Sequence, residues 1–306
     1  MKRKILFTGG TGFIGRHFIA EYSDYQYTLL SRNPDKAKKI LPEETDFITS
    51  LDDLNSLDDF DVVINLAGEP IIDRRWTTRQ KRKIEQSRWE TTSKLVELIA
   101  ASSKPPELMI SGSAIGIYGD TGDSPVDEDS PIDHSAAKLS SDFSHQLCYQ
   151  WEQLALKAKD KTRLVIPRTG IVLDSRGGAL QKMLLPFKCY LGAQLGEGKQ
   201  WFSWMHLQDM ISALHFFIDN SDCQGVYNMT APESVTNQNW TQSLAKALGR
   251  KAFLKVPAFG LKILMGESSQ LLLDSQRIQP KRLLQAGYKF KHPQLESALV
   301  DLVGKK

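Results

Sequence analysis

The stretch that most limits how this chain can fold is FTGGTGFIGRH, residues 7–17, close to the amino terminus. It places Gly9, Gly12 and Gly15 three residues apart, directly after the apolar run KILFT (4–8) and before a helical pattern. Glycines at this spacing allow a tight turn, so that backbone N–H groups and the positive end of a helix reach a pyrophosphate. The position between a strand and a helix therefore predicts a dinucleotide-binding loop.

Short apolar runs alternate with helical patterns through the first half of the chain. We predict strands at residues 4–8, 27–31, 46–50, 61–67, 107–113 and 162–168. Several of them are continuously apolar, as expected when helices cover both faces of a sheet. This alternation predicts an α/β fold with a doubly wound parallel sheet of the Rossmann type.

The pattern changes after about Gly170, where glycine-rich and aromatic segments mix with helices and short strands. We expect residues 1–170 to form the nucleotide-binding domain and residues 171–306 to form mainly a smaller, mixed α/β substrate lobe. The run GVYNMTAP, 225–232, predicts a strand that returns to the sheet.

The overall composition is that of an ordinary globular protein, with 306 residues, 41% hydrophobic residues and 25% charged residues. A net charge of +3 is too small to indicate nucleic acid or an anionic membrane as partner. No apolar run approaches the roughly 20 residues of a membrane helix. Three widely separated cysteines, Cys148, Cys189 and Cys223, predict reduced thiols in a cytoplasmic protein. No His, Cys, Asp and Glu cluster has metal-ligand spacing, so no metal is expected.

The end of the second predicted strand indicates which dinucleotide binds. An acidic residue there would hydrogen-bond the ribose of NAD, whereas an arginine suits the 2′-phosphate of NADP. The sequence LLSRNPDK places Ser31 and Arg32 at the strand end, and the first carboxylate, Asp35, follows Pro34 at a helix start. Arg32 can meet a phosphate with two parallel hydrogen bonds, which predicts NADP(H). A surface arginine without a ligand is the alternative.

A second arginine lies in the helical stretch KRKIEQSRWETTSKLVELIAAS, 81–102. Its apolar stripe comprises Ile84, Leu95, Val96, Leu98 and Ile99, and helical spacing places Arg88 and Thr91 on the same stripe. Burying the charge of an arginine against a sheet is costly unless an anion binds it, and a phosphate of the cofactor could be that anion. A snorkelling arginine at the helix edge is the alternative. Lys83 is a weaker candidate of the same kind.

Several motifs resemble those of the extended short-chain dehydrogenase/reductase superfamily, which includes nucleotide-sugar epimerases. They are TGGTGFIG, NLAG (65–68), SGSAIGIYG (111–119) and WMHLQDM (204–210). Longer segments, at 66–92, 167–187 and from VPAFGLKILMGESS to QRIQPKRLLQAGYKF, resemble one branch, the atypical NADP-binding epimerase family of YfcH-like proteins. The likeness covers nearly the whole chain.

The resemblance implies a set of cofactor-binding positions. A pyrophosphate loop is implied at Gly9, Gly12, Phe13, Ile14 and Gly15, and a 2′-phosphate site at Ser31 and Arg32. The adenine and ribose side is implied at Leu66, Ala67 and Gly68. Arg88 stands where the superfamily has an asparagine near the nicotinamide.

The resemblance also implies a catalytic set that this chain holds only in part. The superfamily transfers a proton through a tyrosine whose pKa is lowered by a lysine four residues later, and a serine holds the substrate oxygen. The serine is Ser113, with Ser111 as the second choice. None of the eight tyrosines has a lysine four residues later. Counting back from Glu152 places Cys148 at the lysine position and Ser144 at the tyrosine position.

Other polar residues have both a functional and a structural interpretation. Tyr118 could reach the pocket, although aromatic packing at the sheet edge is the favoured interpretation. His206 and Asp209 could be a base and its orienting partner, but their spacing at a helix start favours capping. The acidic run VDEDSP, 126–131, predicts a solvated loop.

Two functions follow from these features. The first is an NADP(H)-dependent oxidoreductase or nucleotide-sugar epimerase that acts on a polar, nucleotide-linked or free small molecule with an unconventional proton donor. The second is a non-catalytic NADP(H)-binding regulatory or sensor protein. The retained Ser113 favours the first, and the absent Tyr–Lys pair favours the second. The sequence does not indicate an oligomeric state.

Overall fold

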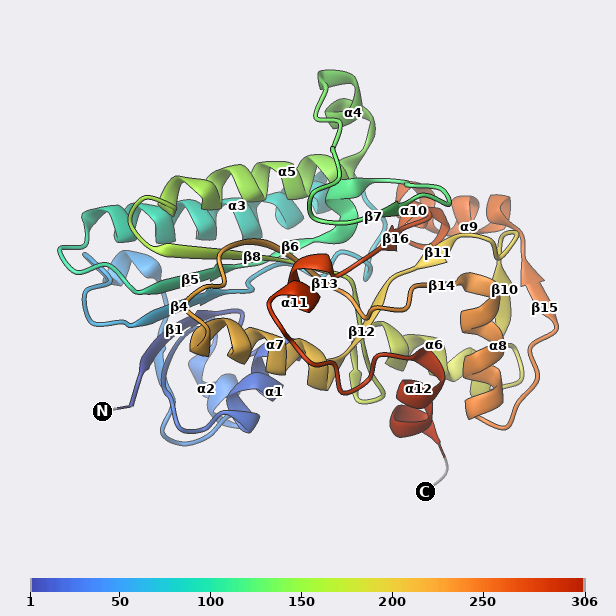
Figure 1. The fold of residues 1–306 in the computed structure, drawn as a ribbon, viewed down its shortest axis with the longest axis horizontal. Helices are drawn as coiled ribbons and strands as arrows, with labels where there is room; N and C mark the ends of the chain where they lie inside the picture. Colours follow the sequence, from blue (N-terminus) through green and yellow to red (C-terminus); the bar gives the residue numbers. More distant parts are fainter. Residues whose placement is uncertain (1, 305–306) are drawn as a thin grey trace.

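The computed structural model describes residues 2–304, and its centre is a parallel β-sheet (Figure 1). The strand order is β13-β8-β5-β4-β1-β2-β3, and the short β6 (Ser113–Ala114) also pairs with β8. The strands of that path are β1 (Lys4–Thr8), β2 (Gln26–Leu30), β3 (Asp46–Ile48), β4 (Val62–Asn65), β5 (Leu108–Ser111), β8 (Arg163–Thr169) and β13 (Gly225–Met229). All six strands predicted in the first half, and the predicted return strand, are confirmed, with small differences at their ends.

Helices cover both faces of the sheet, which explains why its strands are continuously apolar. Figure 1 shows α1 (Phe13–Glu21) and α7 (Leu207–Asp219) on one face, and α3 (Thr78–Ala101) and α5 (Phe143–Ala155) on the other. The short α2 (Pro34–Lys38) follows β2. One apolar cluster fills each side, and every residue of β4 and β5 is buried. The prediction of a doubly wound α/β fold is therefore confirmed.

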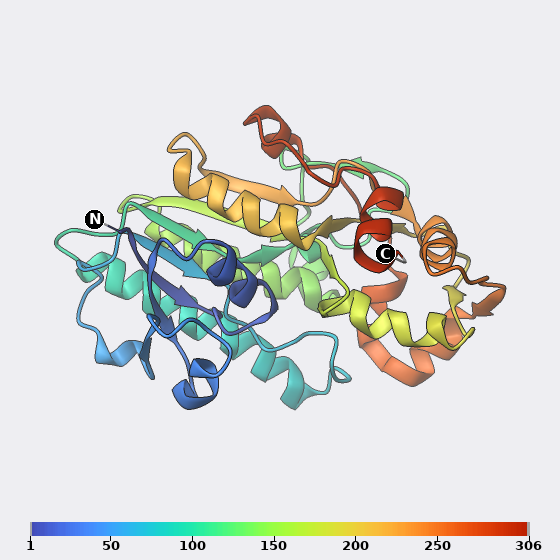
Figure 2. The same ribbon diagram turned by 90° about the horizontal axis from the view of Figure 1, so that it is seen from below.

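A third apolar cluster lies beyond the sheet. It includes Trp204, Trp240 and Leu299. The cluster is built by α6 (Gly178–Lys188), α8 (Asn237–Ala247) and α12 (Leu295–Val303), together with the paired strands β9 (Ile171–Asp174) and β12 (Trp204–His206). Figure 2 shows the yellow-green and orange segments of this lobe at the end of the molecule away from the amino terminus. We propose that these elements form the smaller lobe expected from the change of pattern near residue 170.

The remaining elements of this lobe are short. They are β10 (Ala193–Leu195), β11 (Trp201–Phe202), β14 (Val235–Thr236), β15 (Leu254–Val256), α9 (Ala258–Met265) and α10 (Gln270–Leu273). Strand β10 pairs in parallel with β15, and β11 pairs antiparallel with β14. No helix among residues 2–304 is both long enough and apolar enough to cross a membrane.

The last third of the chain also returns to the first domain. Strand β16 (Arg277–Ile278) pairs with β7 (Pro125–Val126), and α11 (Lys281–Gln285) packs against β13. This contact corrects the prediction of a solvated loop at 126–131, because Glu128 is buried and accepts a 2.8 Å hydrogen bond from the Asn228 N–H. The charged run gave no sign that one of its carboxylates would accept a hydrogen bond from the edge strand β13.

Candidate functional site

The turn between β1 and α1 can be made only by glycine at two of its positions. Gly9 has a φ of 82°, and a Cβ there would lie 2.6 Å from the carbonyl carbon of Leu66. A Cβ on Gly15 would lie 2.6 Å from the Cα of Gly10. The spacing of the glycines is thus explained by close approaches of backbone to backbone.

The same turn presents unpaired donors at the start of α1. Gly12 is the N-cap and has no side chain to cap the helix. The N–H groups of the first turn, at Phe13, Ile14 and Gly15, precede the first intrahelical hydrogen bond, and the helix dipole favours an anion there. The ring of Phe13 packs against Gly177, so the second lobe borders this helix end. The turn can hold a pyrophosphate through main-chain groups alone.

The carboxyl end of β2 lies beside this turn in the sheet. Ser31 is buried, its N–H donates to the carbonyl of Ile48, and its Oγ accepts a 3.3 Å hydrogen bond from the Asn33 N–H. The next residue, Arg32, is exposed, and its guanidinium makes no ion pair among residues 2–304. A buried serine and a free, exposed guanidinium at this strand end suit the 2′-phosphate of NADP.

A buried hydrogen-bond network fixes the strand ends between β1 and β5. The Thr8 hydroxyl donates to Asn65 Oδ1 at 2.7 Å, and Asn65 Nδ2 donates to Thr92 Oγ1 at 2.8 Å and to Ser111 Oγ at 3.4 Å. The N–H of Leu66 then donates to the Thr8 carbonyl. Ser111 therefore lies within this network, which leaves Ser113 as the serine nearer the strand end.

Arg88 lies beneath the loop that follows β4. A Cβ on Gly68 would be 2.7 Å from its Cζ, and Nη1 donates 3.1 Å hydrogen bonds to the carbonyls of Glu69 and Ile84. The guanidinium also sits 5.3 Å from the ring centroid of Trp151. Burial lowers the pKa of Arg88. No carboxylate forms an ion pair with it in the described part of the chain, and its partners there are carbonyls, the Ser87 hydroxyl and an aromatic ring.

The other candidates on α3 lie differently from the expectation. Lys83 is exposed, which makes the weaker of the two basic candidates a solvated side chain in this structure. Thr91 is only partly buried and donates to the Ser87 carbonyl, whereas Thr92 is fully buried. The apolar stripe therefore runs one residue further along than the spacing predicted at this point.

Ser144 and Cys148, where the resemblance led us to expect a tyrosine and a lysine, are small buried side chains. A Cβ on Gly116, in the 3₁₀ turn Ile115–Tyr118, would lie 3.1 Å from Ser144 Cβ and 3.7 Å from Cys148 Sγ. Ser144 is 8% exposed and Cys148 is 3% exposed. Burial raises the pKa of the Cys148 thiol to about 12, so it stays protonated and carries no charge. This part of α5 supplies neither a phenol nor a fixed cation.

Ser113 belongs to a second buried network. Its hydroxyl donates a 2.6 Å hydrogen bond to Glu152 Oε1. Glu152 also accepts two 2.9 Å hydrogen bonds from Arg168, one from Nε and one from Nη2. Both side chains of this ion pair are less than 10% exposed, at 6% and 7%. Glu152 is thus held as a buried carboxylate directly beside the candidate serine.

The network continues to Tyr118. Arg168 Nη1 donates to the Tyr118 hydroxyl at 2.8 Å, and that hydroxyl donates to Asn228 Oδ1 at 2.9 Å. Burial lowers the pKa of Arg168, but the hydrogen bonds and charge of Glu152 outweigh this effect and raise it overall. Burial also raises the pKa of Tyr118. The structure therefore brings Ser113 and Tyr118 into one network, but the permanently charged Arg168 between them blocks proton transfer along it.

A cavity of about 840 Å³ opens beside this region, between the loop after the 3₁₀ turn and the second lobe. Its ionisable lining is five carboxylates and two lysines: Asp120, Asp123, Glu197, Glu267, Asp274, Lys199 and Lys262. Glu267 is paired with Lys81, and Glu197 is paired with Lys199. The cavity is large enough for a small organic molecule, and the ionisable groups of its wall are mainly acidic.

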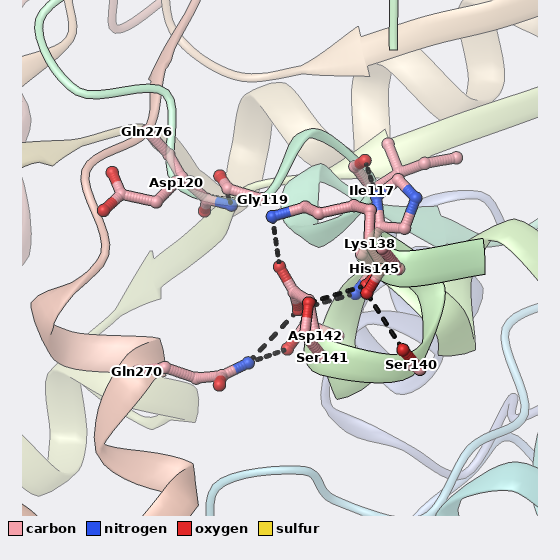
Figure 3. A network of polar contacts seen from close by, with 12 residues as sticks. Ile117, Gly119, Asp120, Lys138, Ser140, Ser141, Asp142, His145, Gln270 and Gln276 are labelled. Carbon is pink, nitrogen blue, oxygen red and sulfur yellow. Dashed lines mark hydrogen bonds and ion pairs between the residues drawn. The ribbon is translucent and has the colours of Figure 1, made fainter. Parts of the chain in front are cut away.

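Figure 3 shows how this cavity is joined to α5. Gln270, on the cavity wall, donates to Asp142 Oδ1 at 3.3 Å and to Ser144 Oγ at 3.4 Å. Asp142 caps α5 through the His145 N–H and forms an ion pair of 3.1 Å with Lys138. Ser144 is therefore one hydrogen bond from a residue of the cavity wall.

Asp274 is a further ionisable group at this place. It lines the large cavity and also a smaller pocket that includes Ile115 and Ile171, and no other residue of that pocket is ionisable. Burial, Asp120 and Asp142 raise the pKa of its carboxyl group to about 6. A carboxyl group with this pKa can exchange a proton near neutral pH.

His206 and Asp209 have the structural role that their spacing favoured. His206 caps α7 through a 3.0 Å hydrogen bond from the Gln208 N–H to its Nδ1, and its ring stacks on that of His292. Asp209 accepts hydrogen bonds from the N–H groups of Lys291 and His292. The pair ties the C-terminal segment to α7 and lies outside the residues that line the large cavity.

Sequence reasoning missed Arg168, Gln270 and Asp274. Arg168 gave a signal, because it ends a predicted strand that is otherwise apolar, and a buried arginine requires an acidic partner. Gln270 and Asp274 gave no signal in the sequence, because their positions depend on how the second lobe packs against α5.

Comparison with known proteins yields matches along the whole chain. Residues 5–230 match the NAD dependent epimerase/dehydratase family, and residues 256–302 match a domain of unknown function, DUF1731. An epimerase family protein of Staphylococcus aureus is 34% identical over 306 residues, which is 99% of this chain and 100% of the relative.

Solved structures give the same result. The crystal structure of the human epimerase family protein SDR39U1 with NADPH superposes with a TM-score of 0.88 at 34% identity, covering 98% of this chain and 99% of that one. A nucleoside-diphosphate sugar epimerase from Corynebacterium glutamicum gives a TM-score of 0.76 at 27% identity, covering 99% of this chain and 59% of that one.

Proposed function

This chain belongs to the NAD dependent epimerase/dehydratase family, and we propose that it is an NADP(H)-binding oxidoreductase that works without the Tyr–Lys pair. The observation that carries this proposal is the contrast between the candidate cofactor site and the candidate catalytic site of the chain. The glycine turn has the close backbone approaches and free N–H groups that suit a dinucleotide, whereas the expected tyrosine and lysine are replaced in this proposal by the buried Ser144 and Cys148.

The cofactor site that we propose is spread over three strand ends. Phe13, Ile14 and Gly15 would donate N–H groups to the pyrophosphate, and Ser31 and Arg32 would hold the 2′-phosphate. The loop Leu66–Gly68 would line the adenine and ribose side, with Arg88 beneath it towards the nicotinamide. The NADPH bound to the human relative of 34% identity supports the choice of NADP(H).

In this proposal the reacting carbon of the substrate lies beside Ser113 of β6. The cofactor supplies hydride exchange with a carbonyl or alcohol carbon. Ser113 donates its hydroxyl hydrogen to Glu152, so the Oγ is free to accept a hydrogen bond from a substrate alcohol. Because Tyr118 is held by Arg168 and Asn228, we place the proton exchange on the cavity side, where Asp274 lies.

The cavity favours one class of substrate. Its lining carries more carboxylates than lysines, and repulsion between like charges disfavours a diphosphate. We therefore favour a polar, neutral or cationic small molecule, and a nucleotide-linked sugar, as expected from the superfamily, is the alternative. The second candidate function, a non-catalytic NADP(H) sensor, is favoured by the uncharged Cys148 thiol at the lysine position.

Replacement of Arg32 tests the cofactor site. Arg32→Ala should weaken NADPH binding by roughly 10-fold or more, because charge-assisted hydrogen bonds to the 2′-phosphate are lost. NADH binding should change by less than about twofold on the same reasoning. Lys38→Ala, which removes another exposed cation close by, is the matched control. Equal losses for both cofactors would contradict the assignment of Arg32, and no affinity for either redox state of NADP would remove the whole proposal.

A label-transfer experiment separates the two candidate functions. NADPH carrying deuterium at the transferable position is incubated with the protein and a broad panel of aldehydes and ketones, and the products are analysed by mass spectrometry. Transfer of the label to one class of carbonyl, lost in Ser113→Ala, would support the oxidoreductase. A protein that binds NADPH tightly but transfers no label across the panel would favour the sensor.

A further inference from the structure

Exposed apolar side chains gather at one end of the molecule. Tyr190, Leu191, Phe253, Leu254, Phe259, Ile263 and Leu264 are each between 49% and 80% exposed, and we call them together the apolar tip. Figure 1 places β10, β15 and α9, the elements that carry or border these residues, at the end of the long axis opposite the amino terminus. Contiguous exposed apolar surface of this kind marks an interaction site.

The two segments of the apolar tip are held together by direct contacts. Strand β10 pairs with β15, with Ala193 opposite Leu254. The Arg250 guanidinium lies 4.4 Å from the ring centroid of Tyr190. On α9, Phe259 and Ile263 are four residues apart, so they project from the same side of the helix. The tip is thus built from a pair of strands and from α9, which follows β15 after one residue.

The two chain segments that build the apolar tip carry positive charges only. Helix α9 also borders the large cavity, where Glu197 and Glu267 are paired with Lys199 and Lys81. Neither residues 175–196 nor residues 234–266 contain an aspartate or a glutamate. Five cations lie in or beside the tip, and none of them makes an ion pair among residues 2–304: Lys188, Arg250, Lys251, Lys255 and Lys262. The net charge of +3 for the whole chain hides this local excess, because the acidic residues lie elsewhere.

We propose that the apolar tip docks this protein on the surface of an anionic lipid bilayer, without spanning it. Exposed aromatic and aliphatic side chains ringed by lysine are the composition that binds at a membrane interface. A second copy of this chain fits poorly, because two identical tips would bring together two sets of unpaired cations. The tip side chains project rather than line a groove, and a bilayer, unlike a folded protein, needs no matching pockets to receive them.

This inference departs from the sequence-based expectation of no membrane partner. That expectation rested on the charge of the whole chain and on the absence of a long apolar run. Neither property reports on a surface that is assembled from two separate segments. Each lysine that approaches an anionic bilayer adds about fivefold to the affinity, and this part of the attraction weakens as salt is added.

Co-sedimentation of the full chain with vesicles tests the proposal. Binding is measured on vesicles of phosphatidylcholine with about 30% phosphatidylserine, on pure phosphatidylcholine vesicles, and at low and high salt. The full chain should bind the anionic vesicles at low salt. Its affinity should be at least about tenfold lower for the neutral vesicles, and at least about tenfold lower for the anionic vesicles at high salt. Lys251→Glu/Lys255→Glu should reduce binding by at least about 20-fold, and Phe259→Ser/Ile263→Ser by at least about tenfold.

The controls and the contrary outcomes are distinct. Val300→Ser removes a side chain of similar exposure, 62%, on α12, and should bind like the original chain. Circular dichroism and thermal melting confirm that each variant is folded. Absence of binding to anionic vesicles, or equal binding to neutral ones, overturns the proposal. A dimer in sedimentation analysis that Phe259→Ser disperses would assign the tip to a second copy, and binding to polyglutamate but not to vesicles would assign it to an acidic protein.

Discussion

Replacing Glu152 with glutamine tests the buried network beside the candidate reaction centre. Glu152 is 5% exposed and accepts two hydrogen bonds of 2.9 Å from Arg168, in addition to one from Ser113. Glutamine keeps the shape of the side chain but leaves Arg168 as an uncompensated buried cation. Breaking a buried ion pair in this way costs roughly 3–5 kcal/mol.

The cost predicts a lower melting temperature. For a chain of this size each kcal/mol corresponds to roughly 2 °C, so Glu152→Gln should melt about 6–10 °C lower. The double variant Glu152→Gln/Arg168→Met should recover part of the loss, because it removes the uncompensated charge. Glu197→Gln, from a pair that is more than 80% exposed on both sides, is the control and should leave the melting temperature unchanged. A Glu152→Gln protein that melts within about 2 °C of the original would refute the reasoning, since this corresponds to about 1 kcal/mol.

Two further changes test other parts of the structure. Gly9→Ala should destabilise the fold by about 2–4 kcal/mol and weaken NADPH binding, because the new Cβ meets the Leu66 backbone at a positive φ; chemical denaturation and fluorescence titration check both effects. Burial and the neighbouring His292 lower the pKa of His206 to about 4, so below pH 6.5 the unfolded chain binds a proton that the folded chain does not. The free energy of unfolding should therefore fall by about 3 kcal/mol between pH 6.5 and pH 4, and His206→Asn, which keeps a capping acceptor, should flatten this part of the stability–pH curve.

The parallel sheet could be predicted well because the sequence features that specify it are local in the chain. Several strands are continuous apolar runs between turn residues, and the glycine turn has steric requirements that only glycine meets. The end of β2 follows from the same local order, since Ser31 and Arg32 directly follow the strand. These features depend on neighbours in the chain, so one sequence is enough to place them.

The candidate reaction centre could be predicted only in part because it depends on distant contacts. The sequence identified Ser113, but its partner Glu152 is 39 residues away and was used only to count back to the missing lysine. Asp274 lies on a segment whose position is set by packing of the second lobe. The buried Glu128 was wrongly predicted to be solvated for the same reason, because its partner Asn228 is 100 residues away.

Cys148, where the resemblance led us to expect a lysine, is the subject of a last prediction. Arg88 and Cys148 influence each other's pKa, so a positive charge already lies close to this position. A lysine introduced at Cys148 would be buried beside the Arg88 guanidinium, and burial and repulsion should together cost at least about 3 kcal/mol in the free energy of unfolding. Cys148→Ala should cost less, because it adds no charge.

A double variant separates repulsion from overpacking. If the charge of Arg88 is the cause, Arg88→Met/Cys148→Lys should be more stable than Cys148→Lys by at least about 1 kcal/mol, although it carries one substitution more. Urea denaturation of the four proteins of this cycle measures the coupling. Additive losses would show that burial of the charge and steric crowding under Gly116, rather than repulsion by Arg88, make a lysine unfavourable at this position.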